Sequence, residues 1–545
     1  MTDPTGLDQI ETIPELLAAR RADSADVRAI VADATTLTYA QLDDASAVVA
    51  ARLIEAGVVK GDRVALLALN TADWAVIAFG VMRMGAVLVP LSTLLRSPEL
   101  AEQLRVAGVS QLIAAPEVRG RSHLDELDAV APGYRDALAG GRRHAAIPSL
   151  RGTHFAGDLT GPEAAPPSAT AEELVQAMED RIRPADDMVV LFTSGSTSTP
   201  KGVIHTHGGG LRATANGLGV RCVGPGDRLY IPMPMFWTGG FSSGLITTAL
   251  AGATLLTEAE PEPEGTLKLL EREQVTLFRG WPDQAAKLAA QPAFSDVDLS
   301  SLTDASLGAL LPADRRPEPG ARPNLFGMTE SFGPYCSDRL DVDMPREKWG
   351  SSGRPLPGVE VRITDPDAGV PCAAGDEGEI WLRGPNILRG ICGRDRSEVF
   401  TADGWFRTGD RGVIDADGYL WYRGRLDDMF KVKGATVYPS EVEGALRALP
   451  SVRQAYVTAV TVGSSTADGE REGSSAPLEV AAAVITDDSV DHVRAAVKDR
   501  LSAFKVPTRW LITTDPGDVP MTATGKVDKR ALRALIENDS PSNDS

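Results

Sequence analysis

The chain has 545 residues, 43% of them hydrophobic, and a formal net charge of −20. Because this length exceeds what one hydrophobic core usually serves, we expect at least two domains. The acidic balance argues against a protein that binds nucleic acid or an anionic membrane surface, since either task requires a basic face, and it favours an enzyme that acts on small molecules.

The cysteines and the N-terminal residues indicate where the protein works. The four cysteines lie far apart without a Cys-x-x-Cys pair, which argues against a disulfide framework or a zinc site and favours a reducing cytoplasm. The first residues lack the basic region and apolar core of a secretory signal. No apolar run reaches the roughly 18 to 20 residues that span a bilayer. We therefore expect a cytoplasmic protein without a transmembrane segment.

The chain then alternates between helical and strand patterns. Residues 37–42 open a predicted helix, residues 63–69 form a predicted strand, and residues 74–84 carry apolar side chains at helical spacing. Residues 85–90 return as a strand, and this rhythm predicts parallel α/β layers. Residues 118–187 are richer in Gly, Pro and charged residues, so we expect surface excursions there.

A loop of Ser, Thr and Gly follows the predicted buried strand 187–192. Its small residues leave backbone N–H groups uncovered, Gly195 permits the positive φ angles that turn successive amides inward, and the hydroxyls add donors, so the loop suits a phosphate group. Lys201 adds a mobile positive charge. The loop is not a Walker A motif, which would place Ser or Thr directly after Gly-Lys. Taken alone, it is equally compatible with a solvated Ser/Thr-rich linker.

Residues 191–203 resemble the phosphate loop of the adenylate-forming superfamily, which includes the acyl-CoA synthetases. Further signatures of that superfamily follow in the superfamily's own order, at residues 324–331, 404–410, 424–434 and 520–529. With similar material N-terminal to them, these matches cover most of the chain, which is identified as resembling the AMP-dependent acid–CoA ligases. Ser198 stands where the superfamily usually has Gly, and Phe326 replaces its aromatic Tyr.

The resemblance implies a fold of two domains. A large N-terminal multi-layer α/β domain, residues 1–424, would bind ATP and the acyl group. A hinge at residues 425–427, with Asp427 as its pivot, would join it to a small mobile α+β C-terminal domain. That domain, residues 428–545, would carry the catalytic lysine.

The same resemblance assigns residues to the nucleotide and to coenzyme A. Phe326 would stack on adenine, Arg425 would contact ribose, and Asp410 would accept hydrogen bonds from both ribose hydroxyls, a task that suits a carboxylate because it offers only acceptors. Taken alone, Thr-Gly-Asp is also ordinary turn chemistry. The full set assigned to ATP or coenzyme A is Thr193, Ser194, Gly195, Ser196, Thr197, Lys201, Phe326, Gly327, Asp410, Arg425, Lys433 and Gly434.

The catalytic set implied by the resemblance is Lys526, Thr329 and Glu330. Glu330 would hold Mg²⁺, which typically takes one or two protein carboxylates beside triphosphate oxygens. Lys526 would act as the adenylation catalyst, because attack of a carboxylate on the α-phosphorus brings two anions together and a cation stabilises the charge that develops. His205 and His207 lack a third ligand nearby, so we expect them to have a structural role.

Residues 232–240 resemble the motif that fronts the acyl pocket, with Trp237 in place of a frequent His. No Asp lies near this stretch to pair with an ammonium, which disfavours an amino acid substrate. The aromatics Trp237, Phe241, Trp281 and Phe332 suggest an apolar acyl group, although such residues are often simply core. The residues predicted to line the pocket are Trp237, Gly239, Gly240, Trp281 and Gly308. The acyl group is left open among fatty, branched, cyclic and aromatic acids.

The function that the resemblance implies is ATP- and Mg²⁺-dependent activation of an apolar carboxylic acid to acyl-AMP, followed by transfer to coenzyme A. Two alternatives stay open: an acyl-AMP ligase that loads a carrier protein, and a nucleotide-binding homologue that has lost catalysis. The expected cofactors are ATP, Mg²⁺ and coenzyme A as co-substrate. The expected partners are small molecules rather than nucleic acid, and a homodimer is left open.

Overall fold

The computed structural model describes residues 9–193, 200–426, 430–432, 435–437, 439–461, 478–498, 500–501, 503–522 and 527–538. The chain divides into two compact units. The larger unit comprises Met1–Val361, Leu382–Arg407 and Asp417–Leu420. The smaller unit comprises Arg362–Trp381, Thr408–Ala416 and Trp421–Ser545. The mixed helices and strands, in a larger N-terminal and a smaller C-terminal unit, confirm the predicted fold class. The mobility of the smaller unit and the boundary at residues 425–427 stay predictions.

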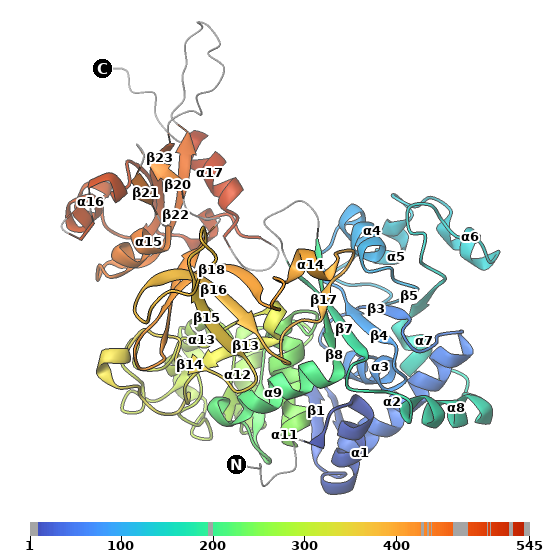
Figure 1. Cartoon of the computed structure of the whole chain (residues 1–545). Helices are drawn as coiled ribbons and strands as arrows, with labels where there is room; N and C mark the ends of the chain where they lie inside the picture. Colours follow the sequence, from blue (N-terminus) through green and yellow to red (C-terminus); the bar gives the residue numbers. More distant parts are fainter. Residues whose placement is uncertain are drawn as a thin grey trace, which may run out of the picture. The chain divides into compact units, whose positions relative to one another are not determined.

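The larger unit contains a seven-stranded sheet with the order β17-β8-β7-β4-β3-β5-β6 (Figure 1). Strands β7, β4, β3, β5 and β6 run parallel, whereas β8 pairs antiparallel with both β7 and β17. This parallel centre is the arrangement predicted from the strand and helix patterns. The strands are β3 (Arg63–Leu67), β4 (Val87–Pro90), β5 (Gln111–Ala114), β6 (Gly152–Phe155), β7 (Asp187–Thr193), β8 (Lys201–Thr206) and β17 (Gly390–Ile391).

Two further sheets complete the larger unit. A five-stranded sheet has the order β11-β9-β10-β1-β2, and a three-stranded antiparallel sheet has the order β12-β13-β14. The strands are β1 (Arg28–Ala32), β2 (Thr35–Thr38), β9 (Arg228–Tyr230), β10 (Thr254–Thr257), β11 (Leu277–Phe278), β12 (Phe326–Met328), β13 (Gly333–Ser337) and β14 (Arg354–Pro355).

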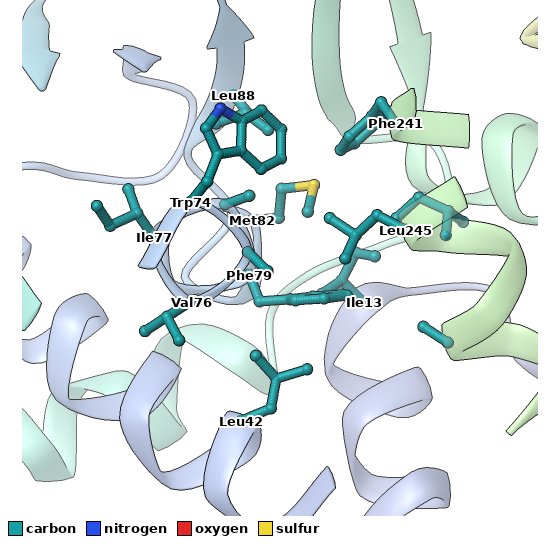
Figure 2. Packing of buried hydrophobic residues seen from close by; sticks show 14 of the residues in the cluster. Ile13, Leu42, Trp74, Val76, Ile77, Phe79, Met82, Leu88, Phe241 and Leu245 are labelled. Carbon is teal, nitrogen blue, oxygen red and sulfur yellow. The ribbon is translucent and has the colours of Figure 1, made fainter. Parts of the chain in front are cut away.

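Helix α3 (Ala72–Arg83) lies in the main hydrophobic core of the larger unit. Every residue of α3 except Asp73 is buried. Figure 2 shows Trp74 and Phe79 of this helix among side chains of other elements, including Ile13 and Phe241. A fully buried side chain of this size contributes about 1.5–3 kcal/mol of hydrophobic stabilisation, so α3 is a principal source of the unit's stability.

The alternation of side chains along β3 separates two cores. Val64 and Leu66 pack in the core around α3, whereas Ala65 and Leu67 pack in a second core. Because successive side chains of a strand point to opposite faces, the seven-stranded sheet is buried on both faces, as a parallel sheet requires.

Helices cover these sheets. Hydroxyl side chains of Thr12, Thr38 and Thr71 cap the N-termini of α1, α2 and α3. The helices of the larger unit are α1 (Ile13–Asp23), α2 (Tyr39–Glu55), α3, α4 (Ser97–Val106), α5 (His123–Leu127), α6 (Tyr134–Ala139), α7 (Ala156–Thr160), α8 (Ala169–Glu179), α9 (His207–Arg221), α10 (Thr238–Gly240), η2 (Phe241–Ile246), α11 (Thr247–Ala251), α12 (Pro263–Arg272), α13 (Pro282–Ala289) and α14 (Arg396–Val399).

The interpretation of residues 118–187 as surface excursions was incomplete. This segment contains β6, which pairs in parallel with β5 and adds the edge strand of the seven-stranded sheet. Tyr134 and Leu127 from the same segment are fully buried in the second core. The segment therefore contributes to the core, because its few apolar side chains find partners on distant elements.

The smaller unit contains most of a sheet with the order β15-β16-β18-β19, a two-stranded sheet β20-β21 and a sheet β22-β23-β24. No helix in the described part of the chain is long and apolar enough to cross a membrane. The elements are β15 (Glu360–Thr364), β16 (Glu377–Arg383), β18 (Phe406–Ile414), β19 (Leu420–Arg425), β20 (Phe430–Val432), β21 (Ala435–Val437), α15 (Pro439–Arg447), β22 (Val452–Thr461), β23 (Leu478–Thr486), α16 (Val490–Lys498), β24 (Arg509–Thr513) and α17 (Lys529–Asn538).

Candidate active site

The predicted phosphate loop connects the two strands of the hairpin β7–β8. Thr193 at the end of β7 pairs with Lys201 at the start of β8. Gly202 is required beside them, because a Cβ there would lie 2.9 Å from Val190 and 3.0 Å from Cys392. The hairpin thus holds Thr193 and Lys201 opposite each other where the loop begins and ends.

The Thr329–Glu330 motif lies in a short 3-10 turn between β12 and β13. Gly327, just before it, must be glycine, since a Cβ would lie 2.2 Å from the carbonyl oxygen of Gly333. The residue after the turn, Phe332, adopts a positive φ of 57°, a conformation that non-glycine residues seldom adopt. This tight backbone depends on contacts from other elements to hold it.

Three contacts from distant segments hold the motif. The backbone oxygen of Thr329 lies 2.7 Å from His205 Nε2, on strand β8 of the hairpin. The hydroxyl of Thr238, at the start of α10, donates to Thr329 Oγ1 at 3.0 Å. The N–H of Leu388 donates to the backbone oxygen of Glu330 at 2.7 Å. The structure therefore brings together three predicted motifs: the phosphate hairpin, the Thr-Glu turn and the acyl-pocket segment.

His205 and His207 are both fully buried and point to different partners. Burial lowers the pKa of each imidazole from the usual 6.5 to about 4, so both are neutral at neutral pH. The His205 ring also packs edge-on against Phe332, with ring centroids 4.9 Å apart. His207 accepts a hydrogen bond at Nδ1 from the backbone N–H of Ile13. Thus His207 ties α1 to α9, whereas His205 contacts the candidate site.

The acyl-pocket segment begins with Trp237, which is half-buried and packs edge-on against Phe236 at 5.3 Å. Gly240 is required because a Cβ would lie 2.3 Å from the carbonyl oxygen of Pro234, and a Cβ on Gly239 would lie 2.6 Å from Met233 Sδ. Gly240 therefore permits a close approach of the backbone at Pro234, and Gly239 leaves room for the side chain of Met233.

The other predicted pocket residues differ in their surroundings. Trp281 is 55% exposed at the start of α13. Gly308 lies beside Pro317, and a Cβ on Gly308 would lie 3.1 Å from the Pro317 ring. Phe241 and Phe332 are two of the four aromatics from which an apolar acyl group was inferred, and they fit the alternative that such residues are core. Both are fully buried in the core around α3, with ring centroids 6.0 Å apart, so they pack against protein rather than facing a pocket.

Phe326, predicted to stack on adenine, lies on β12. Its ring is half-buried and packs edge-on against the ring of Tyr335 on β13, with centroids 5.4 Å apart and an interplanar angle of 64°. Tyr335 is itself fully buried. A buried aromatic therefore holds the Phe326 ring from one side.

In the smaller unit, the two residues predicted to contact ribose form an ion pair. Arg425 Nη1 lies 3.1 Å from Asp410 Oδ1 and donates to the backbone oxygen of Thr408 at 3.0 Å. Asp410 is buried, at 6% exposure. Gly409 lies between Thr408 and Asp410 in the chain. It has a φ of +72°, which glycine adopts without strain. The structure thus brings Asp410 and Arg425 together.

A buried carboxylate supports this pair and was not anticipated from the sequence. Glu379 on β16 is 3% exposed, and its Oε1 accepts a hydrogen bond from Gly409 N at 3.0 Å. Its Oε2 accepts from the indole N–H of Trp381 at 2.8 Å. Glu379 directly precedes the apolar run 380–382, and this is the signal that could have found it, because a buried carboxylate requires partners.

Several predicted site residues lie outside the described residues: Ser194, Gly195, Ser196 and Thr197 of the phosphate loop, the hinge residue Asp427, the coenzyme A residues Lys433 and Gly434, and the catalytic Lys526. The part of the chain that the structure describes contains no cluster of three His, Cys, Asp or Glu side chains that could hold a metal ion. Mg²⁺ beside a triphosphate typically takes one or two protein carboxylates, with nucleotide oxygens and water as its other ligands, so a single carboxylate such as Glu330 is compatible with it.

Comparison with known proteins gives a consistent group of similar proteins. The AMP-binding enzyme family matches residues 17–392. The chain is 33% identical to a feruloyl-CoA synthase of an Amycolatopsis species over 92% of this chain and 94% of that protein. It is 32% identical to a 3-(7a-methyl-1,5-dioxo-octahydro-1H-inden-4-yl)propanoyl:CoA ligase of Mycobacterium tuberculosis, over 97% and 100% of the two chains. Among solved structures, it is similar to the anthranilate CoA ligase AuaEII in complex with anthranoyl-AMP, with a TM-score of 0.75, 25% identity and coverage of 96% and 97%.

Proposed function

The chain belongs to the AMP-binding enzyme family and is an AMP-forming acid–CoA ligase, and we propose that it activates an apolar carboxylic acid with ATP and Mg²⁺. In the first half-reaction, a carboxylate oxygen attacks the α-phosphorus of ATP, the bond to the bridging oxygen breaks and pyrophosphate leaves. In the second, the thiol of coenzyme A attacks the acyl carbon of the adenylate, AMP leaves and the thiol proton is lost.

The observation that supports the first half-reaction best is the set of contacts around Thr329. The hydrogen bond from His205 holds this residue against β8, whose first residue is Lys201. We propose that Thr193, Lys201 and the loop between them bind the phosphates. We propose that Glu330 would hold Mg²⁺, which would neutralise charge on the phosphate oxygens when bound. Thr329 would orient the reacting phosphate or carboxylate through its hydroxyl.

The ion pair of Asp410 and Arg425 supports a ribose site in the smaller unit. Asp410 offers acceptors only, so it can bind both ribose hydroxyls, and Arg425 holds one of its oxygens at 3.1 Å. A buried carboxylate is costly unless it is paired, so the guanidinium also stabilises the charged form that binding requires. We propose that this pair fixes the ribose of ATP.

We further propose that one mobile C-terminal domain serves both half-reactions. Residues 425–427 would be the hinge between residues 1–424 and residues 428–545. One orientation would present Lys526 to the developing charge on the phosphates, and the other would present Lys433 and Gly434 to coenzyme A. The existence of a compact smaller unit that contains residues 421–545 supports this proposal.

The proposed substrate class rests on Trp237. Of the four aromatics from which an apolar acyl group was inferred, all of which the structure describes, Trp237 alone is half-buried; two lie in the core and Trp281 is largely exposed. The two relatives named above act, by their names, on acids with an aromatic ring or fused rings. We propose an apolar acid, with aromatic and cyclic acids as the first candidates beside fatty and branched ones.

The test is pyrophosphate release from ATP and Mg²⁺ across a panel of aliphatic, branched, cyclic and aromatic acids, with and without coenzyme A, with products read by mass spectrometry. A thioester formed only with coenzyme A supports the ligase. Adenylate that accumulates and ignores coenzyme A supports the alternative of a carrier-protein-loading acyl-AMP ligase. No turnover with any acid, while ATP still binds, supports the nucleotide-binding homologue.

Lys526→Ala tests the assignment of the catalyst. The variant is expected to lose adenylation by at least about 100-fold, because one preorganised charge at a transition state is worth roughly that much, while ATP binding measured by calorimetry remains. The neighbouring Lys529→Ala is the control. Full adenylation by Lys526→Ala would show that another residue is the catalyst.

A further inference from the structure

We propose that His205 is a positioning residue for adenylation, because it fixes the peptide that joins Thr329 to Glu330. This inference rests on the function proposed above, which assigns the nucleotide and metal contacts to that pair. His205 was expected from the sequence to be merely structural. Its contacts connect it to the candidate site, although it touches no predicted reacting atom.

The geometry defines the protonation of the ring. His205 Nε2 lies 2.7 Å from the backbone oxygen of Thr329, and the imidazole is fully buried. Since a carbonyl oxygen can only accept a hydrogen bond, Nε2 must carry the proton and act as the donor. The Phe332 ring packs edge-on against the imidazole, with ring centroids 4.9 Å apart, and so limits the orientations open to it.

The contacted backbone requires such support. The Thr329–Ser331 turn is followed directly by Phe332 with its positive φ, which costs of the order of 1–3 kcal/mol for a non-glycine residue. The oxygen of the peptide between Thr329 and Glu330 is held by two hydrogen bonds, from His205 Nε2 at 2.7 Å and from the backbone N–H of Phe332 at 3.0 Å within the turn itself. The two backbone angles that flank this peptide are ψ of Thr329 and φ of Glu330, and a change in either would move the Thr329 hydroxyl and the Glu330 carboxylate relative to each other.

Two other contacts from distant segments fix neighbouring atoms rather than this oxygen. Leu388 N holds the backbone oxygen of Glu330 at 2.7 Å, and Thr238 holds the Thr329 hydroxyl at 3.0 Å. Leu388 lies just before β17, which pairs with β8 at Gly390 and Ile204, so both backbone oxygens are anchored to the same edge of the sheet. Loss of His205 would therefore release one of two adjacent anchors to the sheet, while the hydrogen bond from the N–H of Phe332 to the Thr329 oxygen keeps the turn closed.

Two substitutions at His205 separate the hydrogen bond from the volume of the ring. His205→Leu removes the donor, and His205→Gln keeps an uncharged N–H donor at a similar reach. We expect His205→Leu to lower kcat of acid-dependent ATP–pyrophosphate exchange by about 10- to 100-fold, the effect of roughly a 1 Å misplacement, with less than about a threefold change in KM for the acid. His205→Gln is expected to recover most of kcat.

His207→Leu is the matched control. His207 is equally buried and lies two residues further along the chain, but it contacts Ile13 on α1 rather than the Thr-Glu turn. Both leucine variants are expected to lower the melting temperature. Only His205→Leu is expected to lower kcat, so a loss of kcat in both would overturn the positioning role.

A readout independent of activity distinguishes failure of this inference from failure of the proposed function. In hydrogen–deuterium exchange of the full chain, His205→Leu is expected to increase exchange of amides in residues 329–333, and His207→Leu is not. Unchanged exchange, or unchanged kcat, in His205→Leu overturns the inference. If the wild type activates no acid in the panel, the proposed function fails, and the exchange experiment still decides whether His205 holds the turn.

Discussion

Acidification should destabilise the larger unit through His207, whose imidazole is completely buried at the start of α9. Burial in a low-dielectric environment lowers the pKa of His207 to about 4; the charge of Asp186 opposes this shift to a smaller extent, and the charge of Lys60 adds to it. In the unfolded chain the same imidazole has a pKa near 6.5. Between these two values the unfolded chain binds a proton that the folded chain excludes.

The sign and magnitude follow from linkage. Because the unfolded state binds more protons between about pH 6.5 and pH 4, the free energy of unfolding rises with pH in this range and falls on acidification. The stability that neutral His207 contributes is fully present above pH 6.5 and is lost as the pH falls towards 4. At pH 5 the loss is about 2 kcal/mol, from roughly 1.4 kcal/mol per pH unit over about 1.5 units.

The assay is urea-induced unfolding at pH 7 and pH 5 for the wild type and for His207→Asn. An Asn side chain can still accept the hydrogen bond from the N–H of Ile13 but cannot take up a proton. The wild type is expected to lose about 2 kcal/mol more than the variant between the two pH values, and the subtraction cancels all other titrating groups. His492→Asn, at an exposed position of α16, controls for the substitution itself. Equal losses in wild type and His207→Asn would refute the buried neutral imidazole.

Two further substitutions test the geometry of the candidate site. Glu379→Gln weakens the hydrogen-bond acceptor that holds Gly409 and thereby Asp410. We expect KM for ATP to rise about tenfold, which corresponds to the loss of one charge-assisted hydrogen bond. We also expect the preference for ATP over 2′-deoxy-ATP to become smaller. An unchanged KM for ATP would show that the ribose site does not depend on this carboxylate. Gly327→Ala places a Cβ 2.2 Å from a backbone oxygen and is expected to cost about 1–3 kcal/mol in urea unfolding. Gly157→Ala, where nothing lies within 4 Å, is its control, and equal stabilities would contradict the tight packing at Gly327.

Local patterns in the sequence were sufficient for the parts of the fold that depend on neighbouring residues. The apolar run at residues 63–69 predicted β3 (Arg63–Leu67), and the helical spacing at residues 74–84 predicted α3 (Ala72–Arg83). Hydrophobic periodicity and N-capping hydroxyls act within one or two turns of chain, so both can be seen in a short window. The motifs at Lys201, at Thr329 and Glu330 and at Asp410 were equally visible, because each is a short contiguous run.

Burial was the first property that local sequence could not decide. Phe241 and Phe332 were interpreted as aromatics that indicate an apolar acyl group, and the structure places both in the core. The segment 118–187 had the composition of surface loops, yet it supplies β6 and part of a core. In both cases the outcome depends on which distant elements pack against the residue, and composition carries no information on that.

The sequence by itself determined the family of the chain and its α/β class, and it predicted the chemical types of the candidate site residues, because all of these depend on contiguous motifs and short-range periodicity. Only the tertiary structure decided what holds those residues in place. His205 and Thr329 are 124 positions apart, and Glu379 lies 30 positions before Gly409, yet each pair is joined by one hydrogen bond. Such contacts arise when sheets and turns pack together, so their partners are selected by the three-dimensional arrangement and leave no pattern in any short stretch of sequence.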